Sequence, residues 1–141
     1  MEVAIQEKLV PSLRFREFHS DWKPSKLGEI VEFKKGKGIS KSELDENGKL
    51  PCVLFGQLYT HYGEIINNVI SRTNIDKSNC ILSQENDVII PCSGETHIDI
   101  ARASCILKND VALGGDLTII KSKNNGIFLA YYLNNAKKNE I

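Results

Sequence analysis

Short apolar runs, separated by polar turns that contain glycine or asparagine, constrain the fold of this chain more than any other feature. Each run is shorter than the ~10 residues that a buried helix needs, so the runs are typical of short strands. They lie at Pro51–Phe55, Glu64–Ile70, Asp87–Cys92, Ala103–Leu107 and Leu117–Ile120. The middle of the chain is therefore predicted to form a β-sheet core.

Helices are expected on both sides of this strand-rich region. Ser25 can cap a helix, and apolar residues at helical spacing predict that helix over Lys26–Phe33. Asn125 can cap a second helix over Gly126–Leu133, which is dense in apolar and aromatic residues. The predicted fold class is α+β, with a short mixed or antiparallel sheet core and flanking helices.

Large apolar side chains also gather near the N-terminus. Leu13, Phe15, Phe18 and Trp22 lie within ten residues. A free tail would not carry four such side chains, so we expect them to dock on a surface. The residues before them, 1–12, are predicted to form a polar, disordered leader.

The charge of the chain is balanced, and only its distribution favours a nucleic-acid partner. Eighteen basic residues equal eighteen acidic ones among 141 residues, a length that favours one domain. Between Pro51 and Ile120, four basic residues face eight acidic ones. The segment from Lys34 to Lys41 contains four lysines and no acidic residue. Any phosphate-binding surface is therefore expected to be local.

Cysteine and hydropathy patterns exclude several other classes. The four cysteines form no C-x-x-C pair, which favours reduced, buried thiols over a zinc site, and no metal site is predicted. No secretory leader is visible, and no apolar run approaches the ~20 residues that span a bilayer. We therefore expect a cytoplasmic protein without a membrane partner.

Several segments occur in an order and spacing that resemble one family. They are Val10–Phe18, Asp21–Trp22, Lys26–Ile30, Asn86–Thr96, Leu113–Thr118 and Gly126–Asn134. Together they resemble the specificity subunits of type I restriction-modification enzymes, although Asn86 stands where glycine is more usual. The resemblance implies a target-recognition-domain fold over residues 13–125, followed at 126–141 by the start of a long helix.

The resemblance also implies partners. A full subunit of this kind carries two recognition domains, each of which reads one half of a split target in duplex DNA. It directs methyltransferase subunits, which use S-adenosylmethionine to methylate adenine, and a restriction subunit. The chain looks like one such domain, needs no cofactor of its own, and is either a fragment or a half-subunit. It would then pair with a second copy of itself or with a second recognition domain.

Three segments are candidates for contact with DNA. Phosphate contacts are predicted for Lys34, Lys35, Lys37 and Lys41. A glycine-bounded loop is predicted to read bases with Gln57, Tyr59, Thr60, His61 and Tyr62. A second polar loop, over Ser93–Asp99, is predicted to contribute Ser93, Glu95, Thr96 and His97, and Arg102 is a further candidate. The alternatives are a solvated basic face, tyrosines that cover the core, a polar turn, and a surface salt bridge for Arg102.

The C-terminal aromatic cluster is interpreted as packing rather than readout. Phe128, Tyr131, Tyr132 and Leu133 would face another helix and a methyltransferase subunit. Two other functions remain open. One is a protein-interaction module that docks methyltransferase subunits without selecting DNA. The other is an enzyme using Cys92 or Ser93 with His97, although no G-x-S-x-G elbow or P-loop supports catalysis.

Overall fold

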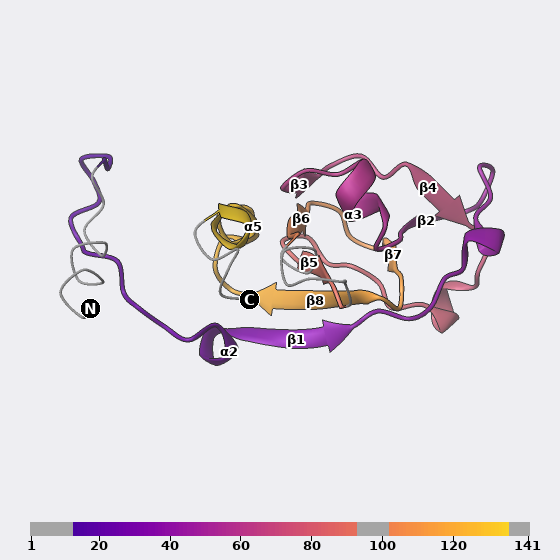
Figure 1. Cartoon of the computed structure of the whole chain (residues 1–141), viewed down its shortest axis with the longest axis horizontal. Coiled ribbons are helices and arrows are strands. Elements are labelled where there is room, and N and C mark those ends of the chain that lie inside the picture. The colour runs from indigo at the N-terminus through magenta and orange to yellow at the C-terminus, as the bar shows by residue number, and fades with distance from the viewer. Residues whose placement is uncertain (1–12, 93–101, 136–141) are drawn as a thin grey trace. The chain divides into compact units, whose positions relative to one another are not determined.

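The computed structural model describes residues 13–92 and 102–135, which divide into two compact units at Ile30 (Figure 1). The predicted leader at 1–12, the predicted loop over Ser93–Asp99 and residues 136–141 lie outside the described residues. Each unit is described by itself below.

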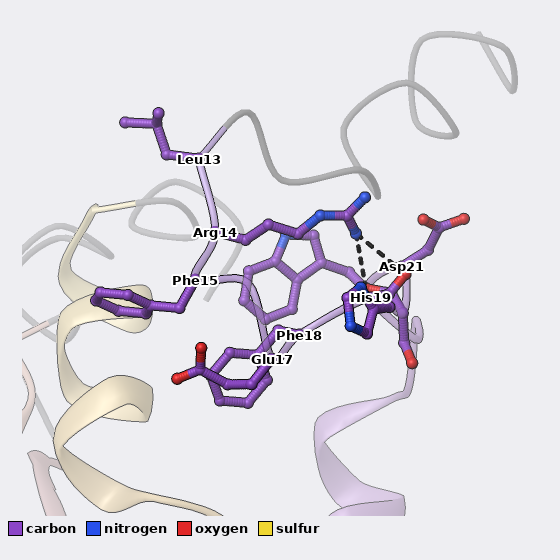
Figure 2. A pocket seen from close by; sticks show the side chains of 9 residues that line it. Leu13, Arg14, Phe15, Glu17, Phe18, His19 and Asp21 are labelled. Atoms are coloured by element: carbon purple, nitrogen blue, oxygen red, sulfur yellow. Dashed lines mark hydrogen bonds between the residues drawn. The ribbon is translucent and has the colours of Figure 1, made fainter.

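The first unit, from Leu13 to Ile30, is a curled segment followed by one helical turn, α2 (Leu27–Ile30). The Phe18 N–H donates to the Phe15 carbonyl at 3.0 Å. Figure 2 shows the Arg14 guanidinium reaching to the backbone at the other end of the curl, where it donates to the His19 carbonyl at 3.2 Å. These bonds shape the backbone of the curl but do not bury its side chains.

The large apolar side chains of this unit are exposed to solvent in the described structure. Leu13 is 91% exposed, and Phe15, Phe18 and Trp22 are each at least half exposed. Their predicted docking on a surface stays a prediction.

The predicted helix over Lys26–Phe33 is wrong beyond Ile30, where the chain enters the strand β1 (Val31–Lys35). Val31 and Phe33 are β-branched and aromatic, types that favour strands. β1 pairs antiparallel with β8 (Leu117–Ser122) along its whole length, from Val31 opposite Ser122 to Lys35 opposite Thr118. This long-range ladder outweighs a helical spacing that extends over only one turn.

The second unit contains a five-stranded sheet in the order β1-β8-β5-β6-β3. The remaining strands are β5 (Val88–Pro91), β6 (Ser104–Ile106) and β3 (Ile65–Ile66). All pairs are antiparallel except β3 with β6. The runs predicted as strands around β5, β6 and β8 are confirmed, whereas the run over Glu64–Ile70 contains only the two-residue β3.

A three-stranded sheet in the order β4-β2-β7 lies in the same unit. It consists of β4 (Ser71–Thr73), β2 (Leu50–Val53) and β7 (Ala112–Leu113), with β2 antiparallel to β4 and parallel to β7. Two short 3-10 helices, at Lys41–Glu43 and Lys77–Asn79, lie in the connections. The α+β class with mixed sheets is therefore confirmed.

The core is built from residues of both sheets. Register places Ile66, Ile89 and Ile119 on one face of the five-stranded sheet, where they form one apolar cluster with Val53 and Leu113 of the smaller sheet. All five are fully buried. Burying side chains of this size contributes roughly 1.5–3 kcal/mol each. The two sheets are therefore held together by shared apolar burial.

The helix α5 (Gly126–Asn135) packs against β5 and β6 through Leu129, Ala130 and Leu133. The predicted cap is confirmed, because the Asn125 side-chain oxygen accepts the Phe128 N–H at 3.1 Å.

Asn86 holds the start of α5. Its backbone has a φ of 82°, a region that asparagine tolerates better than most residues. Its side-chain oxygen accepts the Gly126 N–H at 2.7 Å, and its amide donates to the Asn124 carbonyl at 2.8 Å and the Ser122 carbonyl at 3.1 Å. One side chain therefore ties the end of β8 to the first turn of the helix.

Candidate nucleic-acid interface

The segment predicted as a glycine-bounded loop contains one turn of helix, α3 (Gln57–Thr60). The loop prediction is wrong at this point because Leu58 is fully buried in the core cluster and anchors the segment. The turn is closed by the N–H groups of His61 and Tyr62, which both donate to the Gln57 carbonyl at 3.0 Å. The fold therefore presents these side chains from a fixed helical turn.

Gln57 uses both ends of its side-chain amide within the fold. Its oxygen accepts the Leu54 N–H at 3.0 Å, and its nitrogen donates to the Ser71 hydroxyl on β4. Sequence reasoning missed Ser71, which is 14 residues away and carries no local signal. The geometry makes Gln57 a bridge between the end of β2, α3 and β4.

Tyr62 belongs to the core rather than to the surface that was predicted for it. It is 7% exposed, and its hydroxyl oxygen accepts the Ile70 N–H at 3.0 Å. Burial raises the pKa of the Tyr62 hydroxyl. The alternative reading, in which a tyrosine of this segment covers the core, is the one the structure supports for Tyr62.

Tyr59, Thr60 and His61 are the exposed members of the predicted set. The Thr60 hydroxyl donates to the Gly56 carbonyl at 3.2 Å. A surface of aromatic, hydroxyl and imidazole groups can stack on bases and form hydrogen bonds or apolar contacts at their edges.

The predicted lysines lie on and after β1. Lys34 and Lys35 belong to the strand, Lys37 follows it, and Lys41 begins a 3-10 helix; all four are exposed. Lys34 is 3.7 Å from the Glu32 carboxylate, a surface pair that contributes little to stability. Four exposed cations on one continuous segment provide the charge that phosphate contacts need.

β7 and the glycines that follow it connect the lysine segment to α3. The Lys37 N–H donates to the Leu113 carbonyl at 3.0 Å, and the Gly114 N–H donates to the Val53 carbonyl at 3.0 Å. A Cβ on Gly36 would overlap the Gly114 carbonyl oxygen, so only glycine allows this approach. The backbone after β1 and the end of β2, which leads into α3, therefore flank the same short strand.

Arg102, the further candidate for DNA contact, bonds to the backbone of α3. Its Nε donates to the Leu58 carbonyl of α3 at 3.0 Å. The backbone of the next residue, Ala103, is held by Asn134 of α5, whose oxygen accepts the Ala103 N–H at 2.7 Å and whose amide donates to the Ala103 carbonyl at 2.8 Å. Sequence reasoning missed Asn134, because a pair 31 residues apart leaves no pattern along the chain.

Arg72 is another basic residue to which sequence reasoning gave no site role. It lies on β4 and donates to the carbonyl oxygens of Gly48 and Lys49, the latter at 3.0 Å. These bonds tie β4 to the start of β2.

The second predicted DNA-contacting set, Ser93, Glu95, Thr96 and His97, lies outside the described residues. Its role stays a prediction. The preceding residue, Cys92, is described, and its sulfur lies 2.9 Å from the Thr118 hydroxyl oxygen.

α5 presents an exposed aromatic face. Phe128, Tyr131 and Tyr132 are 53%, 46% and 38% exposed, and the Phe128 and Tyr132 rings stack with centroids 6.0 Å apart. Leu133, predicted as part of a partner interface, is buried inside the unit instead. The helix therefore separates a face that packs on its own sheet from an aromatic face directed to solvent.

All four cysteines are free thiols; Cys52 and Cys105 are buried as predicted, whereas Cys80 and Cys92 are only partly buried. Burial raises the pKa of each of these two thiols to about 11. Within 13–92 and 102–135, no group of three or more histidine, cysteine or acidic side chains could hold a metal ion. No helix in the same ranges has the length and apolar character needed to cross a membrane.

Solved structures show that this fold has relatives. The HsdS subunit from Thermoanaerobacter tengcongensis matches 99% of this chain over 35% of its own length, with 15% identity and a TM-score of 0.60. The type I restriction-modification S subunit from M. genitalium matches 94% over 30%, with 15% identity and a TM-score of 0.58. A chain from a structure on complex assembly and conformational transition of the type I R-M system matches 94% over 31%, with 15% identity and a TM-score of 0.60.

These matches establish the fold, and the chain spans about a third of the length of each solved chain. Among curated proteins, no sequence matches it. The sequence profile of the family described as "Type I restriction modification DNA specificity domain" matches residues 19–141. Because that match covers most of its residues, the chain belongs to the family of type I restriction-modification DNA specificity domains.

Proposed function

We propose that this chain is a target-recognition domain that binds one half-site of a bipartite target in duplex DNA. The observation that carries the proposal is its membership of the DNA specificity family over residues 19–141. The site geometry adds support, because the backbone of the exposed lysine segment bonds to β7, and β7 pairs with β2, the strand that leads into α3.

In this proposal, the lysine segment contacts phosphates and the α3 segment contacts bases. The lysines supply charge to phosphates, which holds the protein on DNA without selecting sequence. Tyr59 and Thr60 on α3 and His61 directly after it contact base edges, and the segment with Ser93, Glu95, Thr96 and His97 adds further contacts. Gln57 and Arg102 support α3 through the bonds described above.

Catalysis belongs to partner subunits in this proposal. Methyltransferase subunits use S-adenosylmethionine to methylate adenine within the target, and a restriction subunit cleaves DNA. The exposed aromatic face of α5 packs against a methyltransferase subunit or against a helix of a second recognition domain, which is a separate domain or a second copy of this chain. The chain itself supplies sequence selection.

The dependence of DNA affinity on salt tests the phosphate part of the proposal. The full chain, in complex with its methyltransferase subunit, is titrated with duplex DNA over a range of salt concentrations. Lys34→Ala, Lys35→Ala and Lys37→Ala together should weaken binding equally for all sequences and reduce the slope of log K against log salt by about 2–3. The matched control is the triple variant Lys77→Ala, Lys108→Ala and Lys123→Ala, which removes the same charge elsewhere and should keep the slope. Equal slopes in the two triple variants would remove the lysines from the interface.

A protein-interaction module that docks methyltransferase subunits without selecting DNA is the second candidate. The zero net charge and the exposed aromatic face of α5 favour it. Under this alternative, the complex with the methyltransferase subunit forms, but the chain adds neither sequence preference nor salt-dependent affinity to it.

A further inference from the structure

α3 is too short to be stable by itself. It comprises four residues, and isolated helices of fewer than ~12 residues are marginal in water. Its geometry must therefore come from what holds it. Leu58 anchors its buried side in the core, and Gln57 bridges its first residue to Leu54 and Ser71.

Arg102 provides a further hold on α3, from a different part of the chain. Its Nε donates to the Leu58 carbonyl at 3.0 Å across 44 residues of sequence. A guanidinium donates in a fixed planar geometry, so such a bond sets direction as well as distance.

The backbone that carries Arg102 is itself anchored. Asn134 of α5 pairs with both the N–H and the carbonyl of Ala103, at 2.7 Å and 2.8 Å. Two hydrogen bonds fix the backbone of that residue more firmly than one. α5 therefore holds the backbone next to Arg102, and the Arg102 side chain bonds to α3.

We propose that Arg102 is a positioning residue that orients α3 for base recognition, with Asn134 as its anchor, and that it makes no phosphate contact. The inference rests on the proposed function, because it assigns a role in reading to α3. A readout element must be held within about half an ångström to distinguish bases. Loss of the Arg102 bond should therefore weaken discrimination between sites while leaving the phosphate contacts intact.

Three substitutions separate the contribution of the Nε–H donor from that of the positive charge. Arg102→Gln places an N–H donor where Nε lies and removes the charge. Arg102→Lys keeps the charge and removes the planar Nε donor. Arg102→Met keeps an unbranched side chain that reaches the position of Nε and removes both donor and charge.

The experiment uses the full chain in complex with its methyltransferase subunit. The target is first identified by sequencing methylated adenines in the host genome. Affinity is then measured for a duplex with this target and for duplexes with one base pair changed in the half-site, at several salt concentrations. Discrimination is the ratio of the two dissociation constants.

The proposal predicts that Arg102→Gln keeps the wild-type discrimination, whereas Arg102→Lys and Arg102→Met reduce it by about five- to ten-fold. The slope of log K against log salt should stay unchanged in all three variants. The proposal is overturned if Arg102→Lys behaves as wild type while the two neutral variants lose affinity and reduce the slope by about 0.9, the signature of one phosphate contact. Unchanged discrimination in Arg102→Met, or equal loss in all three variants, would also overturn it.

A measurement without DNA separates this inference from the proposed function. Hydrogen exchange at the His61 and Tyr62 amides, which close α3, should accelerate in Arg102→Met and stay at the wild-type rate in Arg102→Gln. Asn134→Ala should accelerate the same amides, and combining it with Arg102→Met should add little because both act on one contact. If the wild-type complex binds no DNA, the proposed function fails, and these exchange rates still decide whether Arg102 positions α3.

Discussion

Gln57 shows how a residue type suited to base recognition can be engaged inside a fold. Glutamine in a polar segment is a reasonable candidate for pairing with adenine, and the sequence alone offers no reason to prefer another role. Both polar atoms of its amide are bound instead to Leu54 and Ser71. The two nearby tyrosines also differ in their availability for DNA contact, because Tyr62 is buried while Tyr59 is exposed.

Gln57→Ala should lower the free energy of unfolding by about 1–3 kcal/mol, because the Leu54 N–H and the Ser71 hydroxyl lose their partner. Urea denaturation of the full chain measures it. The matched control is His61→Ala, which alters an exposed neighbour and should change stability by less than about 0.5 kcal/mol. Indistinguishable midpoints for the two variants would contradict the bridging role of Gln57.

The buried thiols predict how stability depends on pH. The pKa of Cys52 and of Cys105 is raised by burial from 9.0 to about 11, so the unfolded chain releases these protons at lower pH than the folded one. The unfolded state therefore binds fewer protons between about pH 9 and pH 11, and the free energy of unfolding falls as pH rises through this window.

Chemical denaturation at pH 8, 9 and 10 tests this dependence. The wild type is compared with the double variant Cys52→Ala and Cys105→Ala. Both proteins contain the same lysines and tyrosines, so the titration of these groups affects the stability of both equally. The wild type should lose more stability than the variant across the series. Parallel pH dependences would exclude a contribution from the two thiols.

For the helices and strands, predictions succeeded where residues close together in sequence both form the pattern and stabilise the element. α5 has dense apolar residues and an asparagine cap, and both features lie within the helix or directly before it. β5, β6 and β8 lie in short segments rich in apolar residues, and most of their side chains are buried. β1 was mispredicted because its partner β8 begins more than 80 residues later in the chain, and α3 was missed because its stability comes from tertiary contacts.

Gly126 tests how tightly α5 is docked. Replacing a helical glycine by alanine normally stabilises a helix by up to ~1 kcal/mol. At Gly126, however, an added Cβ would overlap the Asn86 carbonyl oxygen and lie 2.9 Å from the Cys105 sulfur. Gly126→Ala should therefore destabilise the chain, by about 1–3 kcal/mol.

Thermal or urea denaturation of Gly126→Ala measures the effect. Gly28→Ala in α2 is the matched control, because no atom lies within 4 Å of its added Cβ. The control should be neutral or slightly stabilising. A Gly126→Ala variant as stable as the control would mean that α5 can move away from Asn86 and Cys105 at little cost.

For the whole molecule, the fold class and the family could be predicted from the sequence, whereas the residues of the candidate site could be predicted only in part. The order of motifs from Val10 to Asn134 predicted the family that the profile over residues 19–141 establishes. The lysine segment was recognisable because its members lie close together in sequence with no acidic residue between them. The supports of α3 were not, because Ser71, Arg102 and Asn134 reach their partners across 14 to 44 residues.

Sequence selection by α3 is the central claim, and mapping of DNA methylation tests it most directly. The full chain is expressed with its methyltransferase subunit, and methylated adenines in the host genome are sequenced. The same is done for Thr60→Ala combined with His61→Ala, and for Lys123→Ala as a surface control. We predict a split or palindromic motif that is relaxed in the half-site read by this chain in the α3 variant and unchanged in the control. An identical motif in all three proteins, or a stable complex that produces no methylation motif, would contradict the account.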